Sequence, residues 1–186
     1  MPEISYPIHT ERLILRPLSS ADVDAVHAYQ SNEEVCRYVP FEPRSREVIA
    51  DRIANLLKSQ MNTEEEAISI GVENRETGQL MGDVVLFWRS LEHKSGEIGW
   101  AFHPDYQGRG YAAEAASAAL DLAFDLFEFH RVVARIDVLN TASVALAERL
   151  GMRQEAHLIE NEWFKGRWSD EYDYAILASE WRAARN

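Results

Sequence analysis

Gln107-Gly108-Arg109-Gly110-Tyr111-Ala112 is the stretch of sequence that decides the fold. It follows a strand-like segment at 96–103 and opens an expected apolar helix at 110–128. A glycine turn that feeds a helix N-terminus can hold a phosphate, because the first helical N–H groups lack partners and the helix dipole is positive there. Gly108 and Gly110 carry no Cβ, so a phosphate can approach the backbone closely. An ordinary strand-to-helix turn is the alternative, and the short glycine pattern alone does not decide between them.

The composition predicts one soluble globular domain, 1–186. With 46% hydrophobic and 27% charged residues, the chain can bury a sizeable core. Lys plus Arg number 19 and Asp plus Glu number 31, which gives a net charge of −12. A nucleic-acid groove needs clustered basic charge, so we expect no nucleic-acid partner. The acidic balance fits a cationic acceptor such as an amine, or simply a well-solvated surface.

Cys36 is the only cysteine, which excludes an internal disulfide and a thiolate metal site. A reduced, cytoplasmic setting is therefore expected, with Cys36 a buried or incidental thiol. The first residues are neither basic nor followed by an apolar run, so no signal peptide is expected. No stretch reaches the roughly 18 apolar residues of a membrane span, and we expect no membrane partner. The six histidines lack metal-ligand spacing, so no metal is expected, and His103 before Pro104 indicates local structure rather than a base.

Hydrophobic periodicity and capping residues predict the remaining elements. Before the glycine turn we expect strands at 10–16, 67–72 and 80–88 and helices at 21–30 and 46–61. After the helix at 110–128 we expect a strand at 131–139, a helix that Asn140 caps and Gly151 ends, and a hairpin of strands 157–164 and 169–177 around Lys165-Gly166. In the helix at 110–128, a polar stripe is expected to face solvent: Glu114, Ser117, Asp121, Asp125 and Glu128.

The order β-α-α-β-β-β-α-β-α-β-β predicts an α/β (α+β) fold. Helices cross between strands, and a three-strand meander precedes the glycine turn. We therefore expect a mixed sheet of six to seven strands flanked by about four helices.

At this point the sequence resembles the GCN5-related N-acetyltransferase (GNAT) superfamily. Gln107-Gly108-Arg109-Gly110-Tyr111-Ala112 fits the Q/R-x-x-G-x-G/A signature of that family. Glu97-Ile98-Gly99-Trp100-Ala101-Phe102 stands where the fourth strand of the family should be. Asn140, followed by a helix that ends Leu150-Gly151-Met152, stands where the asparagine that contacts acyl-CoA should be. The resemblance covers nearly the whole chain and implies a single GNAT-like domain.

Two terminal segments resemble one branch of the family, the ribosomal-protein N-terminal acetyltransferases (RimJ/RimL-type). They are the opening Thr10-Glu11-Arg12-Leu13-Ile14-Leu15-Arg16-Pro17 and the closing segment 163–174. The family often dimerises, so the resemblance implies a homodimer, although the sequence names no interface. Trp163, Phe164 and Trp168 suit an acceptor pocket, a core or a dimer surface.

The resemblance implies acetyl-CoA as donor, an amine as acceptor and no metal. It also implies that the backbone of 108–112 holds the pyrophosphate and that the pantetheine arm lies between the strand Trp100-Ala101-Phe102 and the splayed strand 131–139. Asn140 would bind this arm, and it can be a plain helix N-cap at the same time. Arg109 would meet a CoA phosphate or solvent. The expected cofactor-binding residues are thus Trp100, Ala101, Phe102, Gln107, Gly108, Arg109, Gly110, Tyr111, Ala112, Asn140 and Ser143.

Direct transfer from a thioester to an amine needs a neutral amine, a donor for the developing oxyanion and a hydrogen bond or proton for the leaving thiolate. Glu97 is the first candidate for the base. Strand alternation turns Ile98, Trp100 and Phe102 toward the core and Glu97, Gly99 and Ala101 to the opposite face, where a ligand has room. A solvent-facing glutamate is the alternative for Glu97, and weaker candidates for the base are Glu160, Glu162 and Tyr172.

For the thiolate, the chain departs from the common family pattern. Many members place a tyrosine seven residues after the asparagine, and that position is Ala147 here. Ser143 is the nearest remaining hydroxyl, and serine there is typical of the ribosomal-protein branch. A serine of ordinary pKa is a poor proton donor, so a hydrogen bond to the sulfur, with water supplying the proton, suits it better. An ordinary helix residue is the alternative for Ser143.

We therefore expect an acetyl-CoA-dependent N-acetyltransferase that acts on a primary amine. Protein N-termini, small polyamines, amino sugars and amine antibiotics all fit as acceptors. A non-catalytic acyl-CoA-binding regulatory module is the alternative, because Ala147 replaces the tyrosine. The loop 31–44 and the hairpin turn near Lys165 are expected to frame the acceptor site.

Overall fold

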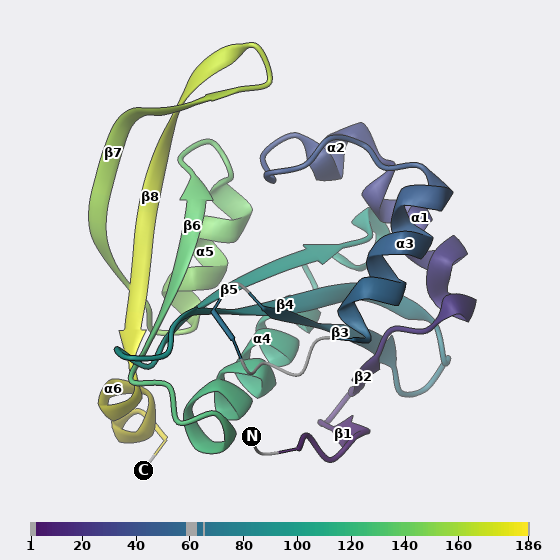
Figure 1. Cartoon of the computed structure of the whole chain (residues 1–186), viewed down its shortest axis with the longest axis horizontal. Helices are drawn as coiled ribbons and strands as arrows, with labels where there is room; N and C mark the ends of the chain where they lie inside the picture. The colour runs from purple at the N-terminus through teal and green to yellow at the C-terminus, as the bar shows by residue number, and fades with distance from the viewer. Residues whose placement is uncertain (1–2, 59–62, 65, 186) are drawn as a thin grey trace.

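A computed structural model describes residues 3–58, 63–64 and 66–185, and these residues form one mixed eight-stranded sheet (Figure 1). Its strand order is β1-β2-β3-β4-β5-β6-β8-β7, in which β5 and β6 are parallel and all other neighbours are antiparallel. The strands are β1 (Ile8–His9), β2 (Leu13–Pro17), β3 (Ala67–Asn74), β4 (Leu80–Ser90), β5 (Ser95–Phe102), β6 (Arg131–Asp137), β7 (Arg153–Phe164) and β8 (Arg167–Leu177).

Helices cover both faces of this sheet. The α-helices are α1 (Val23–Gln30), α2 (Glu33–Cys36), α3 (Arg46–Leu56), α4 (Tyr111–Asp121), α5 (Thr141–Arg149) and α6 (Ala178–Ala183). α1 and α3 pack together and contact β4 and β3, respectively, whereas α4 crosses β2, β4 and β5 on the other face and α5 contacts β6. Ala101 packs against the α1–α3 cluster, but Ile98 and Phe102 belong to the larger α4 cluster, as strand alternation predicts. The predicted α/β fold class is confirmed.

The structure adds elements that the periodicity does not predict. They are β1, the four-residue α2, the C-terminal α6 and short 3₁₀ turns at Ser20–Asp22 and Pro104–Tyr106. The helix expected at 110–128 ends as an α-helix at Asp121 and continues as a π-helical segment, Leu122–Leu126, in which Phe127 N–H donates to Leu122 O at 2.9 Å. The helix expected at 46–61 ends at Leu56, and the last part of that prediction, 59–61, lies outside the described residues.

β5 and β6 separate at the middle of the sheet, which positions the site. Their parallel pairing covers Ser95, Gly96 and Glu97 opposite Arg131, Val132 and Val133. β5 then continues to Phe102 and β6 to Asp137 without further pairing between them in the described chain. The facing edges of both strands therefore keep free backbone groups, as the expected splayed strand requires.

The last two strands form a long hairpin that projects from the sheet (Figure 1). Its two-residue turn has Lys165 at φ 48° and Gly166 at φ 79°, the left-handed pair that suits a tight hairpin between twisted strands. Trp163 and Trp168 pair edge to face near this turn at 5.5 Å and are 61% and 54% exposed. Lys165 Nζ donates to the carbonyl oxygens of Cys36 and Phe41, so the hairpin tip contacts the segment around α2. No helix among the described residues is long and apolar enough to cross a membrane.

Candidate active site

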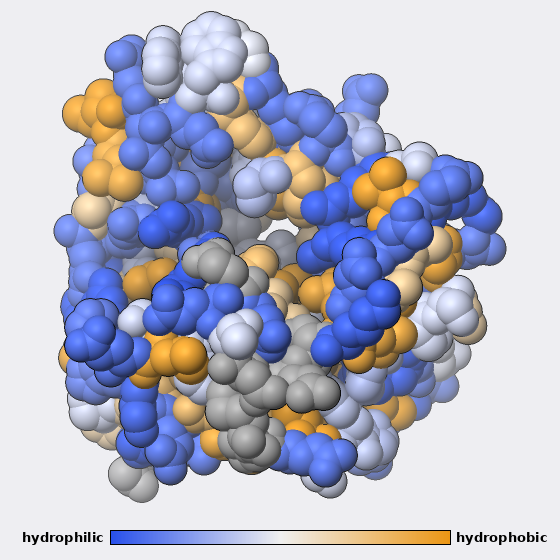
Figure 2. Space-filling model, viewed as in Figure 1, coloured by the Kyte–Doolittle hydropathy of each residue, from blue (hydrophilic) through white to orange (hydrophobic). Residues whose placement is uncertain are grey.

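A cavity of about 470 Å³ lies where β5 ends and where α4 and α5 begin. The segment from α2 to Val39 forms its opposite wall, and the molecule is visibly hollowed near the middle of Figure 2. Most of the residues expected to bind the cofactor line this cavity, namely Trp100, Ala101, Phe102, Gln107, Gly108, Gly110, Tyr111, Ala112, Asn140 and Ser143. Arg109 and Glu97 do not line it. Segments that are far apart in the sequence thus meet around one pocket.

The glycine turn enters α4 through two left-handed glycines, Gly108 at φ 71° and Gly110 at φ 81°. Gly110 is the N-cap and supplies no side-chain oxygen to the first helical N–H groups. The first backbone bond of the helix runs from Glu114 N–H to Gly110 O at 3.1 Å. The N–H groups of residues 111–113 therefore lack hydrogen-bond partners inside the helix. These residues line the cavity, where an anion would satisfy their N–H groups.

Arg12 of the loop before β2 fastens this turn. Its Nη1 donates to Arg109 O at 3.0 Å, and its Nε forms an ion pair with Glu114 Oε2 at 2.7 Å. Backbone N–H of Arg12 and the hydroxyl of Thr10 donate to Glu114 Oε1 at 2.8 and 2.6 Å. The guanidinium also lies 4.6 Å from the ring centre of Tyr111. The backbone of the turn is therefore held from outside the cavity.

The prediction that Glu114 belongs to a solvated stripe is wrong, because its side chain is only 16% exposed and is fully engaged. Burial raises the pKa of the Glu114 carboxyl, but the bonds from Thr10 and Arg12 outweigh burial, so its pKa lies below the usual value. Asp121 of the same stripe is also engaged, since it accepts from Trp181 Nε1 at 2.9 Å. Helical spacing alone cannot reveal partners that come from the loop before β2 and from α6.

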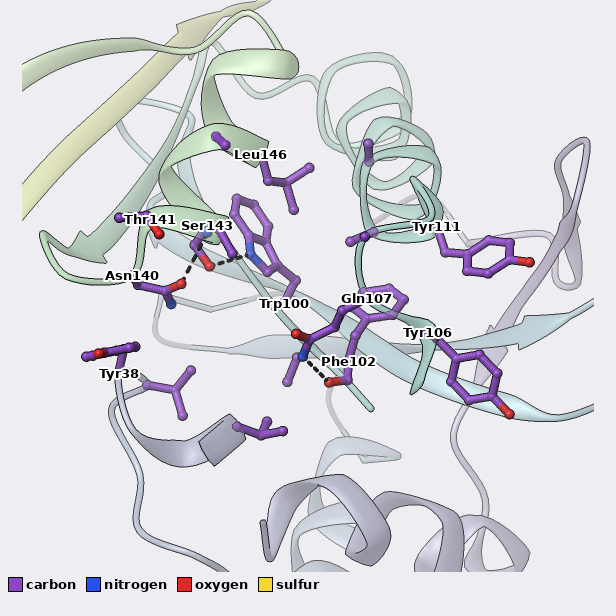
Figure 3. A pocket seen from close by; sticks show the side chains of 18 of the residues that line it. Tyr38, Trp100, Phe102, Tyr106, Gln107, Tyr111, Asn140, Thr141, Ser143 and Leu146 are labelled. Carbon is purple, nitrogen blue, oxygen red and sulfur yellow. Dashed lines mark hydrogen bonds between the residues drawn. The ribbon is translucent and has the colours of Figure 1, made fainter. Parts of the chain in front are cut away.

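Asn140, Ser143 and Trp100 form a connected group inside the cavity (Figure 3). Asn140 Oδ1 accepts from Ser143 N–H at 3.2 Å, so Asn140 is the N-cap of α5, as predicted. The side-chain NH₂ of Asn140 is left to donate to a ligand. Trp100 Nε1 donates to Ser143 Oγ at 3.1 Å, so Trp100, expected to face the core and to bind the cofactor, also reaches across to α5. Ala147 is completely buried and does not line the cavity.

Glu97 lies outside this group, on the opposite face of β5. Its carboxylate forms ion pairs with Arg89 at 3.0 Å and Arg135 at 3.8 Å and is 15% exposed. Arg135 also lies 4.0 Å from Asp173 on β8. The sheet register places Glu97 beside Val133, and Arg135 opposite Asp173, so these side chains share a face. The two expected catalytic residues are therefore separated: Ser143 lines the cavity, and Glu97 does not.

Glu171 extends this acidic face. It lies opposite Asp137 in the register and accepts from Asn161 Nδ2 at 3.2 Å. Burial raises the pKa of the Glu171 carboxyl, and the nearby charge of Asp173 raises it further. Among the weaker candidates for the base, Glu160 has a left-handed backbone at φ 49°, and Tyr172 stacks edge to face on His157. None of these residues lines the cavity.

The cavity also has charged walls that the sequence does not single out. Arg37 and Arg149 line it, and Glu34 contributes a carboxylate from α2. The expected framing loop, 31–44, supplies Glu34 and Arg37 together with Val35, Tyr38 and Val39, whereas Arg149 is the last residue of α5. The four-residue α2 forms because Asn32 Oδ1 caps it by accepting from Glu34 N–H at 2.8 Å. Only this Asx pattern hints at α2 in the sequence.

Other predicted positions have local roles. His103 Nδ1 accepts from Asp105 N–H at 3.2 Å and caps the 3₁₀ turn, as expected of a structural histidine. Gln107 Nε2 donates to Phe102 O at 3.0 Å, which ties the turn to the end of β5. Cys36 is a buried free thiol, and burial raises its pKa. No group of three His, Cys, Asp or Glu side chains that could hold a metal occurs among the described residues.

A buried carboxylate supports the floor beneath the cavity. Asp83 on β4 lies opposite Ala101 and is only 2% exposed. It accepts from Tyr29 at 2.6 Å, from Ser69 at 2.8 Å and from Gln30 at 3.3 Å. Burial, followed by the charge of Asp83, raises the pKa of Tyr29 well above its usual value. These bonds fix α1 on the sheet and hence the loop that walls the cavity.

Comparison with known proteins adds an independent line of evidence. Residues 12–153 match the family described as the acetyltransferase (GNAT) domain. An "Uncharacterized N-acetyltransferase YnaD" from Bacillus subtilis is 34% identical over 174 residues, which cover 94% of this chain and 98% of the relative.

Two solved structures share the architecture. An acetyltransferase of the GNAT family from Bacillus anthracis superposes with a TM-score of 0.82 at 34% identity and covers 93% of this chain and 99% of that protein. A spermidine N-acetyltransferase from Vibrio cholerae, solved in complex with CoA and spermine, has a TM-score of 0.82 at 26% identity. The latter likewise covers 93% of this chain and 99% of that protein.

Proposed function

The chain belongs to the acetyltransferase (GNAT) family and is an N-acetyltransferase; from this premise we propose that it transfers the acetyl group of acetyl-CoA directly to a primary amine. The observation that carries the proposal is the cavity that joins the glycine turn, the end of β5 beyond its pairing with β6 and the start of α5. A long thin donor with phosphates at one end and a thioester at the other matches these three features in order. The Vibrio cholerae relative, solved with CoA, supports acetyl-CoA as the donor.

The phosphate end of the donor belongs at the glycine turn. Backbone N–H groups of residues 108–112 and the positive end of the α4 dipole attract a pyrophosphate. Arg37 and Arg149 add positive charge to the walls of the same cavity. Arg109 is a weaker candidate, since its side chain does not line the cavity.

The pantetheine arm belongs between β5 and β6. Its amides would pair with the free edge of Trp100-Ala101-Phe102, and the side-chain NH₂ of Asn140 would donate to one of its carbonyl oxygens. This arrangement leaves the thioester near Ser143. A β5 backbone N–H is then available to donate to the oxyanion that develops on the thioester carbonyl.

The transfer itself is a direct displacement. The amine nitrogen forms a bond to the acetyl carbon, the carbon–sulfur bond breaks, and its electron pair leaves with sulfur. The nitrogen loses one proton, and the thiolate takes one from solvent. Glu97 is the proposed base, and its carboxylate forms ion pairs with Arg89 and Arg135. Because Glu97 does not line the cavity, a water must carry the proton to it.

For the acceptor we favour a small cationic amine. Glu97, Glu171 and Asp173 lie on one face of the sheet beside the separated strands, and Glu34 lies in the cavity wall. Negative charge there would draw in a protonated amine. The relative that is a spermidine N-acetyltransferase supports this choice. A protein N-terminus is the other proposed acceptor, and it rests on the resemblance of the segments 10–17 and 163–174 to the ribosomal-protein branch.

The test is a panel of amines with acetyl-CoA, comprising polyamines, amino sugars, amine antibiotics and peptides with free N-termini. We expect at least one amine to gain an acetyl group, and we expect Glu97→Gln and Ser143→Ala to lower turnover without abolishing acetyl-CoA binding. If the wild-type protein binds acetyl-CoA but acetylates no amine, and neither variant changes anything, the chain is a non-catalytic acyl-CoA-binding module instead. The cytoplasmic setting and the homodimer stay predictions.

A further inference from the structure

Trp100 connects the two sides of the cavity through one hydrogen bond. Its backbone belongs to β5 beyond the last residue paired with β6, and its indole N–H donates to Ser143 Oγ on α5 at 3.1 Å. Ser143 is also held by its backbone N–H, which donates to Asn140 Oδ1 at 3.2 Å. The hydroxyl of Ser143 is therefore fixed on its acceptor side by a side chain whose ring is itself packed against the core (Figure 3).

A fixed acceptor side determines where the serine proton can point. A hydroxyl oxygen has two lone pairs and one proton, and the indole N–H can only donate. With the indole on one lone pair, the Ser143 proton must be directed elsewhere, and Ser143 lines the cavity. The indole N–H also polarises the hydroxyl, because hydrogen bonds in a chain strengthen one another.

We propose that Trp100 is a positioning residue of the acetyl transfer, which acts through Ser143 by aiming its hydroxyl proton at the sulfur of the leaving thiolate. This inference rests on the proposed function. As the carbon–sulfur bond breaks and its electron pair moves to sulfur, the Ser143 hydroxyl donates a hydrogen bond to that sulfur. The proton that the thiolate finally keeps comes from solvent, and it balances the proton lost by the amine. Trp100 itself neither gains nor loses a proton.

The test is a double-mutant cycle on Trp100→Phe and Ser143→Ala, measured as kcat and KM with the best acceptor of the amine panel. Phenylalanine keeps most of the aromatic body and removes the N–H. We expect Trp100→Phe to lower kcat about three- to tenfold, the range expected for one lost hydrogen bond, with KM for acetyl-CoA changed much less. In the Ser143→Ala background the same substitution should have no further effect on kcat, because its partner is gone.

Trp88→Phe is the matched control. Trp88 lies in the core, and its Nε1 has no hydrogen-bond partner among the described residues. This control also replaces an indole in contact with the core, yet it breaks no such bond, so kcat should stay within about twofold of wild type. Thermal unfolding of every variant shows whether it is folded, and Trp100→Leu, which also lacks a donor, replaces Trp100→Phe in the cycle if the latter does not fold.

Two results would overturn the inference. One is an unchanged kcat for folded Trp100→Phe. The other is a fall in kcat by the same factor with and without Ser143, since Trp100 would then act by another route. Both require an active wild-type enzyme, so they differ from a failure of the proposed function, in which the wild-type protein itself acetylates nothing.

Discussion

Arg12 contacts Arg109 and Glu114, which lie 97 and 102 positions further along the chain. These contacts hold the glycine turn from the side away from the cavity. We predict that Arg12→Ala raises KM for acetyl-CoA about tenfold, because a loosened turn no longer presents its N–H groups together to the phosphates. The free energy of unfolding should fall by only about 1 kcal/mol, since the Arg12 side chain is partly exposed.

The control for this prediction is Arg46→Ala, which removes an exposed ion pair with Asp24 outside the cavity. In steady-state kinetics, kcat and KM of this control should stay close to those of wild type. An unchanged KM for acetyl-CoA in Arg12→Ala would show that the turn holds its shape without the arginine.

The sequence predicts the roles of some single residues but not of others. Asn140 as a helix cap and His103 as local structure follow from local rules, and the structure confirms them. The burial of Glu114 could not be predicted from local rules, because its partners Thr10 and Arg12 are distant in the chain. Strand alternation tells that Trp100 faces the core side but not that its indole N–H reaches Ser143. The roles of Glu97 and Ser143 in catalysis stay predictions.

Glu155 on β7 illustrates a carboxylate whose charge stabilises the fold. The hydrogen bond from Arg131 is the main cause that lowers its pKa from 4.5 to about 2; burial opposes it, and Arg153 adds to the lowering. A carboxylate with a lowered folded-state pKa stabilises the protein above its unfolded pKa, and the stabilisation is lost as the pH falls toward the folded value. We predict that Glu155→Gln lowers the free energy of unfolding by about 1 kcal/mol at pH 7, after allowance for solvent screening.

That cost should shrink as the pH falls from 4.5 toward about 2, and urea unfolding of both proteins across this range measures it. The control is Glu128→Gln, because Glu128 is exposed and pairs with Lys94 at the surface. If the free energies of unfolding of Glu155→Gln and wild type differ by the same amount down to pH 2, the charge of Glu155 is not what stabilises the fold.

At the scale of elements, the glycine turn offers a pair of equivalent substitutions. Gly108 at φ 71° and Gly78 at φ 70° both have open space where a Cβ would stand, but only Gly108 lines the cavity. We predict that Gly108→Ala and Gly78→Ala each lower the free energy of unfolding by about 1–2 kcal/mol, because alanine is strained in this left-handed conformation.

Only Gly108→Ala should also raise KM for acetyl-CoA, because the added methyl group stands where the phosphate approaches the backbone. Kinetics and urea unfolding on the same two proteins separate the two effects. Equal KM values for both variants would place the phosphate elsewhere.

The elements that the sequence misses are short or distorted. α2 has four residues and β1 has two, so neither shows a repeating apolar pattern. The π-helical segment 122–126 keeps the apolar pattern of a helix, and periodicity therefore extends α4 beyond its true end. The long amphipathic elements, by contrast, occur where the sequence predicts them.

At the scale of the whole molecule, Lys165 joins the hairpin tip to the segment around α2, 129 positions earlier. We predict that Lys165→Asn raises KM for the acceptor amine, because it removes the contact with Cys36 O and Phe41 O and loosens a wall of the cavity. Asparagine before glycine suits this turn, so the hairpin itself should persist. KM for the amine and thermal unfolding report the two effects separately.

Lys94→Asn is the matched control, since Lys94 also has a left-handed backbone, at φ 47°, and its ammonium pairs only at the surface with Glu128. This variant should leave KM for the amine unchanged. If Lys165→Asn does the same, the hairpin tip does not help to shape the acceptor site.

The order of elements and the mixed sheet could be predicted from periodicity together with the family resemblance. The cavity could be predicted only in outline, because it arises where β5 and β6 part and where three distant segments meet. The acceptor could not be predicted, since the wall that the segment around α2 gives to the cavity comes from a short loop that carries no repeating pattern.

The most direct measurement follows a labelled acetyl group. The wild-type protein is incubated with acetyl-CoA that carries carbon-13 in the acetyl group and with a polyamine or a peptide with a free N-terminus, and the products are read by mass. We predict that the label appears as an amide on the amine, with free CoA thiol in equal amount. Label that stays on CoA, or that is released as acetate while every amine remains unmodified, would contradict direct transfer to an amine.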